Sequence, residues 1–434
     1  MNQPRSPQAP LKSLDEALAQ LLAFASPLTG TEQVSTFDAD GRVLAQDLVS
    51  ALQVPPHDNS SMDGYAVRCA DLGDSGPTLP VSQRIAAGST GTALAPMSVA
   101  RIFTGAPIPE GADAVVMQED CVVQSDGSVR ISSAPRPGQW IRRAGEDVTS
   151  GAVVLPNGER LTPAALGLAA SIGMNRLTVA RKPKVALFST GDELVMPGEV
   201  PPEQMKPGAI YNSNRFFLKA LLTRLGCEVS DLGIVPDERA ATMDALRDAA
   251  QHHDLILTSG GVSVGEEDHI KPAVQSLGHL DLWQIAIKPG KPFAYGWVGQ
   301  GSTLQPHTSH DGQAGTGVAG AGAHFIGLPG NPVSSFVTFL LLVRPFLLKL
   351  QGVVDTAPES IALRADFTWA RADKRREFLR ARRTLSGGLE LFANQSSGVL
   401  TSAVWSDGLV DNPPGCTIAP GDVVRFIPFT ELLA

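Results

Sequence analysis

The sequence predicts a multidomain α/β protein, in which a central parallel-sheet domain lies between a mainly β N-terminal region and a small, barrel-like C-terminal β domain. Three observations predict this fold class. The chain has 434 residues, which at roughly 150 residues per domain allows about three domains. Strand-like and helix-like apolar patterns alternate over residues 181–352, whereas short β-type runs separated by turns fill both flanks. The 43 glycines, 33 prolines and 6% aromatic residues favour loops and strands over a helical bundle.

Composition and charge exclude several classes of protein. The net charge is −9 and the sequence pI is about 5.4, so the molecule repels polyanions and we expect no nucleic-acid partner. The four cysteines form no CxxC pair, and residues 1–10 lack the apolar core of a secretory signal, which favours a reduced, cytoplasmic chain. The most apolar run, Phe336–Val343, is followed by Arg344 and Pro345 and falls short of the about 20 residues that a membrane span needs, so we expect no membrane partner.

The N-terminal region is predicted to contain one helix followed by short strands. Residues 1–10 carry three prolines and no apolar periodicity, which is typical of a disordered tail. Ser13 then precedes an acidic first turn, and leucines at three- and four-residue spacing share one face of a helix. From Thr31 to about Leu161, β-type runs such as Val115–Met117 are separated by Gly, Pro and Asp turns. We interpret this stretch as mainly β.

The central domain is predicted from alternating patterns that begin at Arg181. Strands followed by covering helices imply a parallel sheet with helices on both faces. The predicted strands are Lys184–Thr190, Glu228–Val235, Asp254–Ser259, Leu282–Ile287, Phe293–Val298 and Ala323–Leu328, and the predicted helices are Asn214–Leu225, Asp237–His252, Asp268–Leu277 and Ser334–Leu350. Residues 299–322 are rich in Gly, Ser, Thr and Gln and are interpreted as a surface insertion. Its GxGxxG letters follow no strand and open no helix, so we expect no dinucleotide site there.

Residues that directly follow the predicted strands carry the candidate chemistry, because ligands bind at the carboxyl ends of the strands of an open parallel sheet. Gly260, Gly261 and Gly330 let backbone N–H groups approach an anion, which favours a phosphate or oxyanion cradle over ordinary turns. Lys288 and Lys291 lie in a Pro-Gly loop and are either charges for an anionic ligand or solvated loop lysines. A P-loop motif is absent from the sequence.

Carboxylates in three of these loops suit Mg²⁺, which prefers hard oxygen ligands beside phosphates. They are Glu193, Asp237 and Asp268, although Asp237 also precedes a helix and fits the role of its N-cap. Seven basic residues between Arg371 and Arg383 form either a solvated face or a local funnel for a small anion.

Three polar loops of the N-terminal region have no packing purpose of their own. They are Pro55–Ala66, Arg101–Pro107 and Arg142–Asp147, all marked by glycine and charged side chains. If these loops serve the predicted pocket, they reach another subunit's sheet or fold back on their own.

Ten segments in order along nearly the whole chain together carry a family resemblance. They read PPHDNSSMDGYAVR, RIFTGAPIPEGADAVVMQED, IRRAGEDV, FSTGDEL, YNSN, TSGGVSVGEED, KPGKPFAYG, GLPGNPVSS, RREFLRAR and NQSSGVL. This set resembles the MoeA-type molybdopterin molybdenumtransferases, the family that includes the gephyrin E domain. The chain departs from the family pattern in two places. The 299–322 insertion is longer than expected and is either a lid or, more simply, an inert loop. Ala144 stands where a more polar or basic residue is expected.

The resemblance implies that molybdate is inserted into adenylylated molybdopterin with Mg²⁺-assisted release of AMP, giving molybdenum cofactor. It implies a homodimer whose cleft joins the α/β domain of one subunit to the β arm of the other, and contact with the upstream adenylyltransferase. The resemblance implies three domains: an N-terminal region at 11–180, an α/β domain of the molybdopterin-binding type at 181–352 and a C-terminal β domain at 355–434. Within the N-terminal region, residues 31–48 and 147–180 form a linking subdomain and residues 49–146 form the β-rich arm. The helix at 13–25 is expected to pack on the α/β domain.

The resemblance also implies which residues act. The residues implied in catalysis are Asp58, Thr104, Asp147, Glu193, Asp237 and Asp268. Of these, Glu193, Asp237 and Asp268 are also the implied ligands of Mg²⁺. For holding molybdate and the pterin substrate they give Ser259, Gly260, Gly261, Lys288, Lys291, Pro329, Gly330, Pro332, Ser334, Arg376 (or Arg375) and Ser397. Two alternatives stay open: the molybdopterin adenylyltransferase, whose loop is of a Gly-Gly-Thr-Gly type where this chain has Gly-Gly-Val-Ser, and a scaffold module of the gephyrin E-domain kind.

Overall fold

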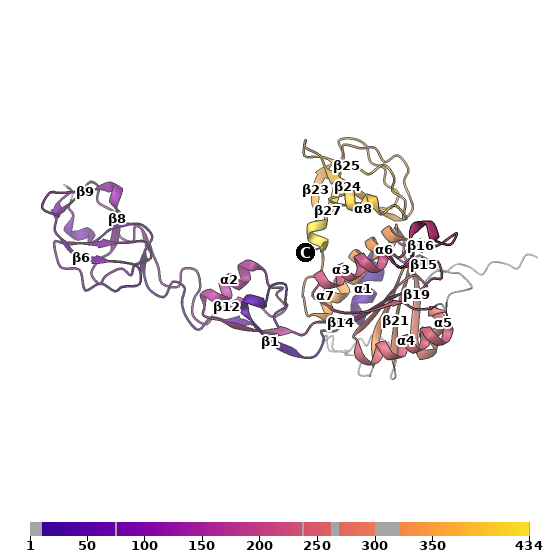
Figure 1. Ribbon diagram of the computed structural model, residues 1–434. Helices are drawn as coiled ribbons and strands as arrows, with labels where there is room; N and C mark the ends of the chain where they lie inside the picture. Colours follow the sequence, from indigo (N-terminus) through magenta and orange to yellow (C-terminus); the bar gives the residue numbers. More distant parts are fainter. Residues whose placement is uncertain (1–10, 74–75, 237, 262–268, 300–321, 434) are drawn as a thin grey trace, which may run out of the picture. The chain divides into compact units, whose positions relative to one another are not determined.

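The computed structural model describes residues 11–73, 76–236, 238–261, 269–299 and 322–433 (Figure 1). The chain divides into two compact units. The α/β unit comprises Met1–Glu32, Gly41–Ala45 and Val179–Ala434, and the arm unit comprises Gln33–Asp40 and Gln46–Thr178. The expected tail, residues 1–10, and the expected insertion, residues 300–321, lie outside the described residues.

A six-stranded sheet forms the centre of the α/β unit. Its order is β17 (Glu228–Ile234), β14 (Lys184–Ser189), β18 (Leu255–Ser259), β22 (Gly322–Leu328), β21 (Pro292–Gly299) and β19 (Gly278–Gln284). The first four strands are parallel, as predicted, whereas β21 and β19 are antiparallel to their neighbours. The predicted parallel-sheet α/β domain is therefore confirmed, with an antiparallel edge at β21 and β19. No helix lies between β19 and β21 to provide the crossover that a parallel pair needs.

Helices cover both faces of this sheet because its strands are apolar on both sides. Val185 and Leu187 of β14 pack with α1 (Leu14–Phe24), α3 (Asn214–Arg224), α6 (Pro332–Thr338), the π-helical turn η5 (Phe339–Val343) and α7 (Arg344–Leu350). Ala186 and Phe188 point to the other face, against α4 (Arg239–His252) and α5 (Ile270–Leu277). Figure 1 shows these two groups of helices on opposite sides of β14 and β21. The predicted helices and strands are confirmed, with ends that shift by a few residues.

Helix α1 begins at a capping box. The Glu16 amide donates to the Ser13 hydroxyl at 3.2 Å, and the Ser13 amide donates to Glu16 Oε2 at 2.9 Å. Leu14, Ala17 and Leu21 are buried in the core on the sheet, so this helix packs on the α/β domain.

The continuous helical stretch Pro332–Leu350 is 19 residues long and apolar enough to cross a membrane by length and composition. It is longer than the apolar run that the sequence marked, because Arg344 and Pro345 continue the helix as the first turn of α7. Within its most apolar 18-residue window 89% of the residues are buried inside the protein, which is the behaviour of a core helix.

The C-terminal sheet is joined to the α/β domain by a short strand. Its path is β20 (Ile287–Lys288), β24 (Arg376–Arg383), β26 (Gly408–Asn412), β27 (Val423–Pro428) and β23 (Ile361–Arg364), with β25 (Leu389–Leu391) beside β24. Strand β20 belongs to the central domain and pairs in parallel with β24, so that Lys288 lies opposite Glu377. Helices α8 (Thr401–Trp405) and α9 (Phe429–Leu433) complete this part.

The arm unit is built from short strands, as predicted. One sheet has the order β6 (Val81–Ile85), β7 (Val99–Ile102), β4 (Gly64–Val67) and β8 (Ala114–Met117), and another has β5 (Thr78–Leu79), β10 (Val129–Ile131) and β9 (Cys121–Val123). Two further antiparallel pairs are β11 (Ile141–Arg142) with β3 (Asn59–Ser60), which joins the first polar loop to the third, and β12 (Val153–Leu155) with β2 (Leu48–Val49). Helix α2 (Pro163–Ser171) lies nearby in sequence, and β1 (Thr31–Ser35) pairs with β13 (Arg176–Ala180).

Candidate functional site

A pocket of about 760 Å³ opens at the carboxyl ends of β14, β18 and β22. This is the edge of the sheet at which the sequence placed the candidate residues, and the volume is that of a small-molecule site. Four segments supply most of the lining: Thr190–Leu194, Ile210–Asn214 with β16 (Ile210–Tyr211), Ser259–Gly261 and Pro329–Ser334. Of the predicted site residues, the structure brings together here Glu193, Ser259, Gly260, Gly261, Pro329, Gly330, Pro332 and Ser334.

One buried amide joins three of these segments. Asn214, in the first turn of α3, donates from Nδ2 to the Ser259 hydroxyl at 2.7 Å and to the Gly330 carbonyl at 2.7 Å. Ser259 ends β18 and Gly330 follows β22, so this side chain fixes the distance between two neighbouring loops. The pocket wall is therefore set by hydrogen bonds before any ligand arrives, which reduces the entropy cost of binding.

Two glycines shape the pocket for different reasons. Gly261 has φ of +69°, a backbone conformation that favours glycine, and a Cβ atom there would lie 2.4 Å from Ile270 Cδ1, so that the end of this side chain would have to move. A Cβ atom on Gly330 would meet nothing within 4 Å, so no protein contact demands glycine there. The absence of a side chain at Gly330 instead leaves room in the pocket, as expected of a loop that a ligand approaches closely.

Glu193 lines the pocket together with Thr190, which is nearly buried. Together with the Ser259 hydroxyl they offer oxygen donors only, which is the chemistry that Mg²⁺ prefers. Asp237 and Asp268, the other two predicted metal ligands, lie outside the described residues. Among the residues that are described, no group of three or more His, Cys, Asp or Glu side chains could hold a metal ion.

Asn212 lines the same pocket and was not singled out as a site residue from the sequence. Its side chain is 2% exposed, and Oδ1 accepts a hydrogen bond from the Arg215 amide at 3.2 Å. That bond fixes the orientation of the amide, because only the oxygen can accept it. Within the described part of the chain, Nδ2 then has no hydrogen-bond partner. The signal in the sequence was an Asn just before a helix, which is usually interpreted only as a cap.

Lys288 is held by carboxylates rather than free for a ligand. Its Nζ lies 2.9 Å from Glu377 Oε1 and 3.6 Å from Asp373. Glu377 is 1% exposed, and its other oxygen accepts from Trp369 Nε1 at 2.7 Å. The pair joins β20 to β24, so Lys288 links the α/β domain to the C-terminal sheet. Lys288 does not line the pocket at the carboxyl ends.

Lys291, three residues further on, is in a different situation. In the part of the chain that the structure describes, no carboxylate lies within ion-pair distance of its ammonium group. The next residue, Pro292, lines the pocket. Of the two predicted lysines, Lys291 is therefore the one whose charge is available to an anionic ligand.

The two candidate arginines of the RREFLRAR motif are both paired. Arg376 holds the nearly buried Asp411 through two hydrogen bonds of 2.6 and 2.7 Å, and it also contacts Asp15 of α1. Arg375 binds Asp373 in the same two-point manner, and the guanidinium holds the pKa of that carboxyl well below its usual range. The structure thus places Arg376 away from the pocket at the carboxyl ends, at a separate hollow beside α1.

The NQSSGVL loop reaches the pocket through Gly398, next to the predicted Ser397. The Ser397 carbonyl accepts from the Val333 amide at 2.9 Å, which joins this loop to the start of α6 and to Ser334. Arg380 holds the loop from behind, since its Nη2 donates to the Ser396 carbonyl at 3.4 Å. Burial lowers the pKa of Arg380 to about 10, so this guanidinium stays charged at neutral pH.

The structure brings the three polar loops of the arm unit together within that unit. Asp58 accepts from the Ala144 amide at 2.8 Å and from Arg143 at 2.6 Å, so it ties the first loop to the third. The Ala144 amide, more than anything else, keeps the pKa of Asp58 below its usual value. Thr104 is exposed in the second loop, and Asp147 is exposed in the third.

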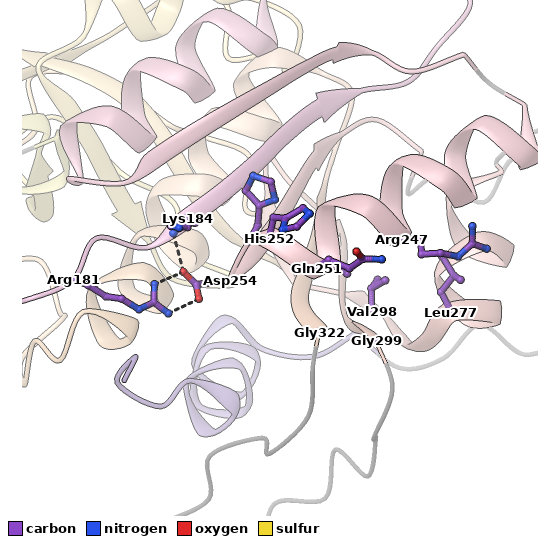
Figure 2. Close-up of a pocket in the computed structure, with 12 residues that line it drawn as sticks. Arg181, Lys184, Arg247, Gln251, His252, Asp254, Leu277, Val298, Gly299 and Gly322 are labelled. Carbon is purple, nitrogen blue, oxygen red and sulfur yellow. Dashed lines mark hydrogen bonds and ion pairs between the residues drawn. The ribbon is translucent and has the colours of Figure 1, made fainter. Parts of the chain in front are cut away.

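A different pocket, of about 740 Å³, lies at the amino ends of the parallel strands (Figure 2). Arg181 there binds Asp254 through two hydrogen bonds of 2.8 and 2.7 Å, and the Lys184 amide donates to the same carboxylate. Gly299 and Gly322, which are paired in register and flank the insertion, also line it. The roots of the insertion therefore lie at the opposite end of β21 and β22 from the candidate site, although they are close to its loops in sequence.

Three family models match the chain in order. They are "MoeA N-terminal region (domain I and II)" over residues 12–173, "Probable molybdopterin binding domain" over residues 186–349 and "MoeA C-terminal region (domain IV)" over residues 362–429. The chain is 45% identical over 341 residues to the molybdopterin molybdenumtransferase of Haemophilus influenzae, covering 78% of each chain. It is 35% identical over 432 residues to molybdopterin molybdenumtransferase 2 of Mycobacterium tuberculosis, covering 96% of each. Gephyrin of Dictyostelium discoideum is 32% identical over 372 residues, which cover 78% of this chain and 49% of gephyrin.

Solved structures give the same relationship. The molybdopterin biosynthesis MoeA protein from Pyrococcus horikoshii OT3 has a TM-score of 0.79 at 27% identity, covering 96% of this chain and 100% of that one. A second structure of a MoeA protein from Pyrococcus horikoshii has a TM-score of 0.71 at 30% identity, covering 97% of this chain and 99% of that one.

Proposed function

Because this chain belongs to the MoeA family of molybdopterin molybdenumtransferases, we propose that it inserts molybdate into adenylylated molybdopterin with Mg²⁺-dependent release of AMP. The family makes it an enzyme of molybdenum cofactor biosynthesis. The further details, which are the adenylylated substrate, the role of Mg²⁺ and the release of AMP, are part of the proposal.

One observation supports the proposal above the others. The segments FSTGDEL, YNSN, TSGG and PGNPVSS are far apart in sequence, yet they line one pocket at the carboxyl ends of three parallel strands. The backbone N–H groups of Gly261 and Gly330 and the hydroxyls of Ser259 and Ser334 offer the donors that phosphate and molybdate oxygens need, whereas the Gly260 amide already donates to the Leu328 carbonyl at 3.1 Å. The volume of about 760 Å³ suits a pterin with a phosphate attached.

Individual side chains take distinct roles in this proposal. Lys291 supplies the positive charge for the molybdate dianion, since it has no carboxylate partner among the described residues. Glu193, with Asp237 and Asp268, would hold Mg²⁺, which when bound neutralises charge on the phosphates. Lys288 and Arg376, in contrast, orient the C-terminal sheet through Glu377 and Asp411.

We further propose that the protein is a cytoplasmic homodimer that receives its substrate from the upstream adenylyltransferase. The polar loops of the arm unit support the homodimer, because Asp58 is hydrogen-bonded to the third loop and Thr104 and Asp147 are exposed, where a second copy can reach them. In a dimer of the expected kind these loops serve the pocket of the other copy.

The experiment that tests the function is AMP release from adenylylated molybdopterin, with molybdate and Mg²⁺ each present or omitted. We expect release only when both are present, together with reconstitution of an apo-molybdoenzyme. Glu193→Gln keeps the shape of the side chain and removes its charge, so it is expected to abolish the Mg²⁺ dependence and slow release. Tight pterin binding without any AMP release would refute the proposed reaction and favour a binding module.

A further inference from the structure

Asp63 in the arm unit makes a contact that determines which chemistry Thr104 can offer. The Thr104 amide and the Thr104 hydroxyl both donate to Asp63 Oδ1, each at 2.8 Å. Asp63 lies just before β4 and Thr104 follows β7, 41 residues away. Both side chains are exposed on the arm.

The two loops are held in this arrangement by the backbone. The Gly105 amide donates to the Ser60 carbonyl at 2.8 Å, and the Ser60 amide donates to the Ala106 carbonyl at 2.9 Å. Arg101 fixes the residue before Thr104, because its guanidinium lies 4.6 Å from the centre of the Phe103 ring. The Asp63–Thr104 contact is therefore part of an ordered loop pair.

The protons in this contact can be assigned from the chemistry of the groups. The Thr104 amide, then the Thr104 hydroxyl, lower the pKa of Asp63, and the charge of Arg101 acts in the same direction. The carboxyl group is thus ionised at neutral pH, and an ionised carboxylate only accepts hydrogen bonds. The single hydroxyl hydrogen of Thr104 must point to Asp63, which leaves only lone pairs of Oγ1 for any other partner.

We infer that Asp63 is a positioning residue that holds the Thr104 hydroxyl as a hydrogen-bond acceptor, so that Thr104 receives an N–H group of the substrate and not an oxyanion. The inference rests on the proposed function, in which Thr104 contacts the substrate. Phosphate and molybdate present only acceptor oxygens at neutral pH, and the Asp63 charge beside Thr104 repels them. The pterin and adenine rings both carry N–H donors, which this pair of acceptors can receive.

A double-mutant cycle tests whether Asp63 acts through Thr104. The variants are Thr104→Val, which keeps the shape and removes the hydroxyl, Asp63→Ala, and the two combined, with Thr104→Ser and Asp63→Asn as conservative controls. We expect Thr104→Val and Asp63→Ala each to raise the KM for adenylylated molybdopterin about tenfold, the usual effect of losing one good hydrogen bond. The combined variant should be no worse than either one, because the two side chains form one unit.

The conservative controls separate this role from a structural one. Thr104→Ser and Asp63→Asn both keep an acceptor oxygen where it is needed, and we expect KM within about twofold of the unchanged protein. The half-saturating concentration of molybdate should stay unchanged in all five variants. Thermal unfolding midpoints show that each variant is folded.

Binding measurements then identify the donor and keep the test independent of turnover. The dissociation constants of molybdopterin and of AMP are measured separately without Mg²⁺, and we expect Thr104→Val to weaken one of them about tenfold. Weaker molybdopterin binding assigns the contact to the pterin ring, and weaker AMP binding assigns it to adenine. Additive losses in the cycle, a changed molybdate dependence, or no change in either constant would each overturn the inference. If the unchanged protein releases no AMP, the proposed reaction fails, while the binding constants still decide the role of Thr104.

Discussion

Replacing Lys288 by Met is expected to destabilise the protein, whereas the same change at Lys291 is expected to weaken only molybdate binding. Lys288 compensates the charge of Glu377, which is 1% exposed and has no other cation within hydrogen-bonding distance among the described residues. Removing one partner of a fully buried ion pair costs roughly 3–5 kcal/mol. Lys288 itself is 41% exposed, and Glu377 keeps its bond from Trp369. Water therefore screens part of the interaction, and we expect a loss of about 2 kcal/mol.

The assay is urea-induced unfolding at pH 7 for both variants and for the double variant Lys288→Met with Glu377→Gln. The double variant should regain most of the lost stability, because its buried group no longer carries a charge. Lys291→Met should unfold within about 0.5 kcal/mol of the unchanged protein. Its half-saturating molybdate concentration should rise about tenfold, which corresponds to one charge-assisted hydrogen bond. A Lys288→Met protein as stable as the unchanged one, or a double variant no better than Lys288→Met alone, would refute this reasoning.

Three further predictions concern a buried histidine, a glycine of the pocket and the Mg²⁺ of the proposed reaction. Burial lowers the pKa of His324 to about 4, and the charge of Asp254 opposes this shift only in part. Below about pH 6.5 this histidine therefore binds a proton in the unfolded protein but not in the folded one. The free energy of unfolding is expected to fall by about 3 kcal/mol between pH 6.5 and 4. Urea unfolding of His324→Gln should lack that loss, whereas the exposed His279→Gln should keep it. Gly261→Ala should impair pterin binding without abolishing folding, because it strains one turn of the pocket; equilibrium titration with molybdopterin measures it, and unchanged affinity would count against the pocket. Chelation of Mg²⁺ should stop AMP release and its readdition should restore it, and release that persists in excess chelator contradicts the metal assignment.

Much of the lining of the candidate pocket could be predicted from the sequence, because it depends on features that span only a few residues. The end of each predicted strand is visible in the sequence, because an apolar run stops there and polar or glycine residues follow. In a parallel sheet these following residues all lie at the same edge. Glu193, Gly261 and Gly330 were predicted on this ground alone, and the structure places them in one pocket. The capping box at Ser13 is equally local, since it involves residues three positions apart.

Other features depended on residues that are distant in the chain. Lys288 and Lys291 have the same sequence context, yet only Lys288 meets Glu377, 89 residues later, because β20 adds to the C-terminal sheet beside β24. The predicted elements already contained no helix between the strand at 282–287 and the strand at 323–328, but only the observed strand pairing shows that this edge of the sheet is antiparallel. Asn212 belongs to the YNSN segment of the family resemblance, but only the structure shows that its amide Nδ2 is buried beside the pocket without a partner among the described residues.

The sequence by itself determined the order of the secondary structure, the edge of the sheet at which the candidate pocket lies and the residue types available there. Short-range free energies govern these features: side-chain periodicity, caps and turns act over a few residues. Only the tertiary structure decided which charges are paired and which hydroxyl groups already donate a hydrogen bond. Arg376 forms an ion pair with Asp411, and the Thr104 hydroxyl donates to Asp63. Such partnerships join residues that only strand pairing brings together, and no local pattern encodes them.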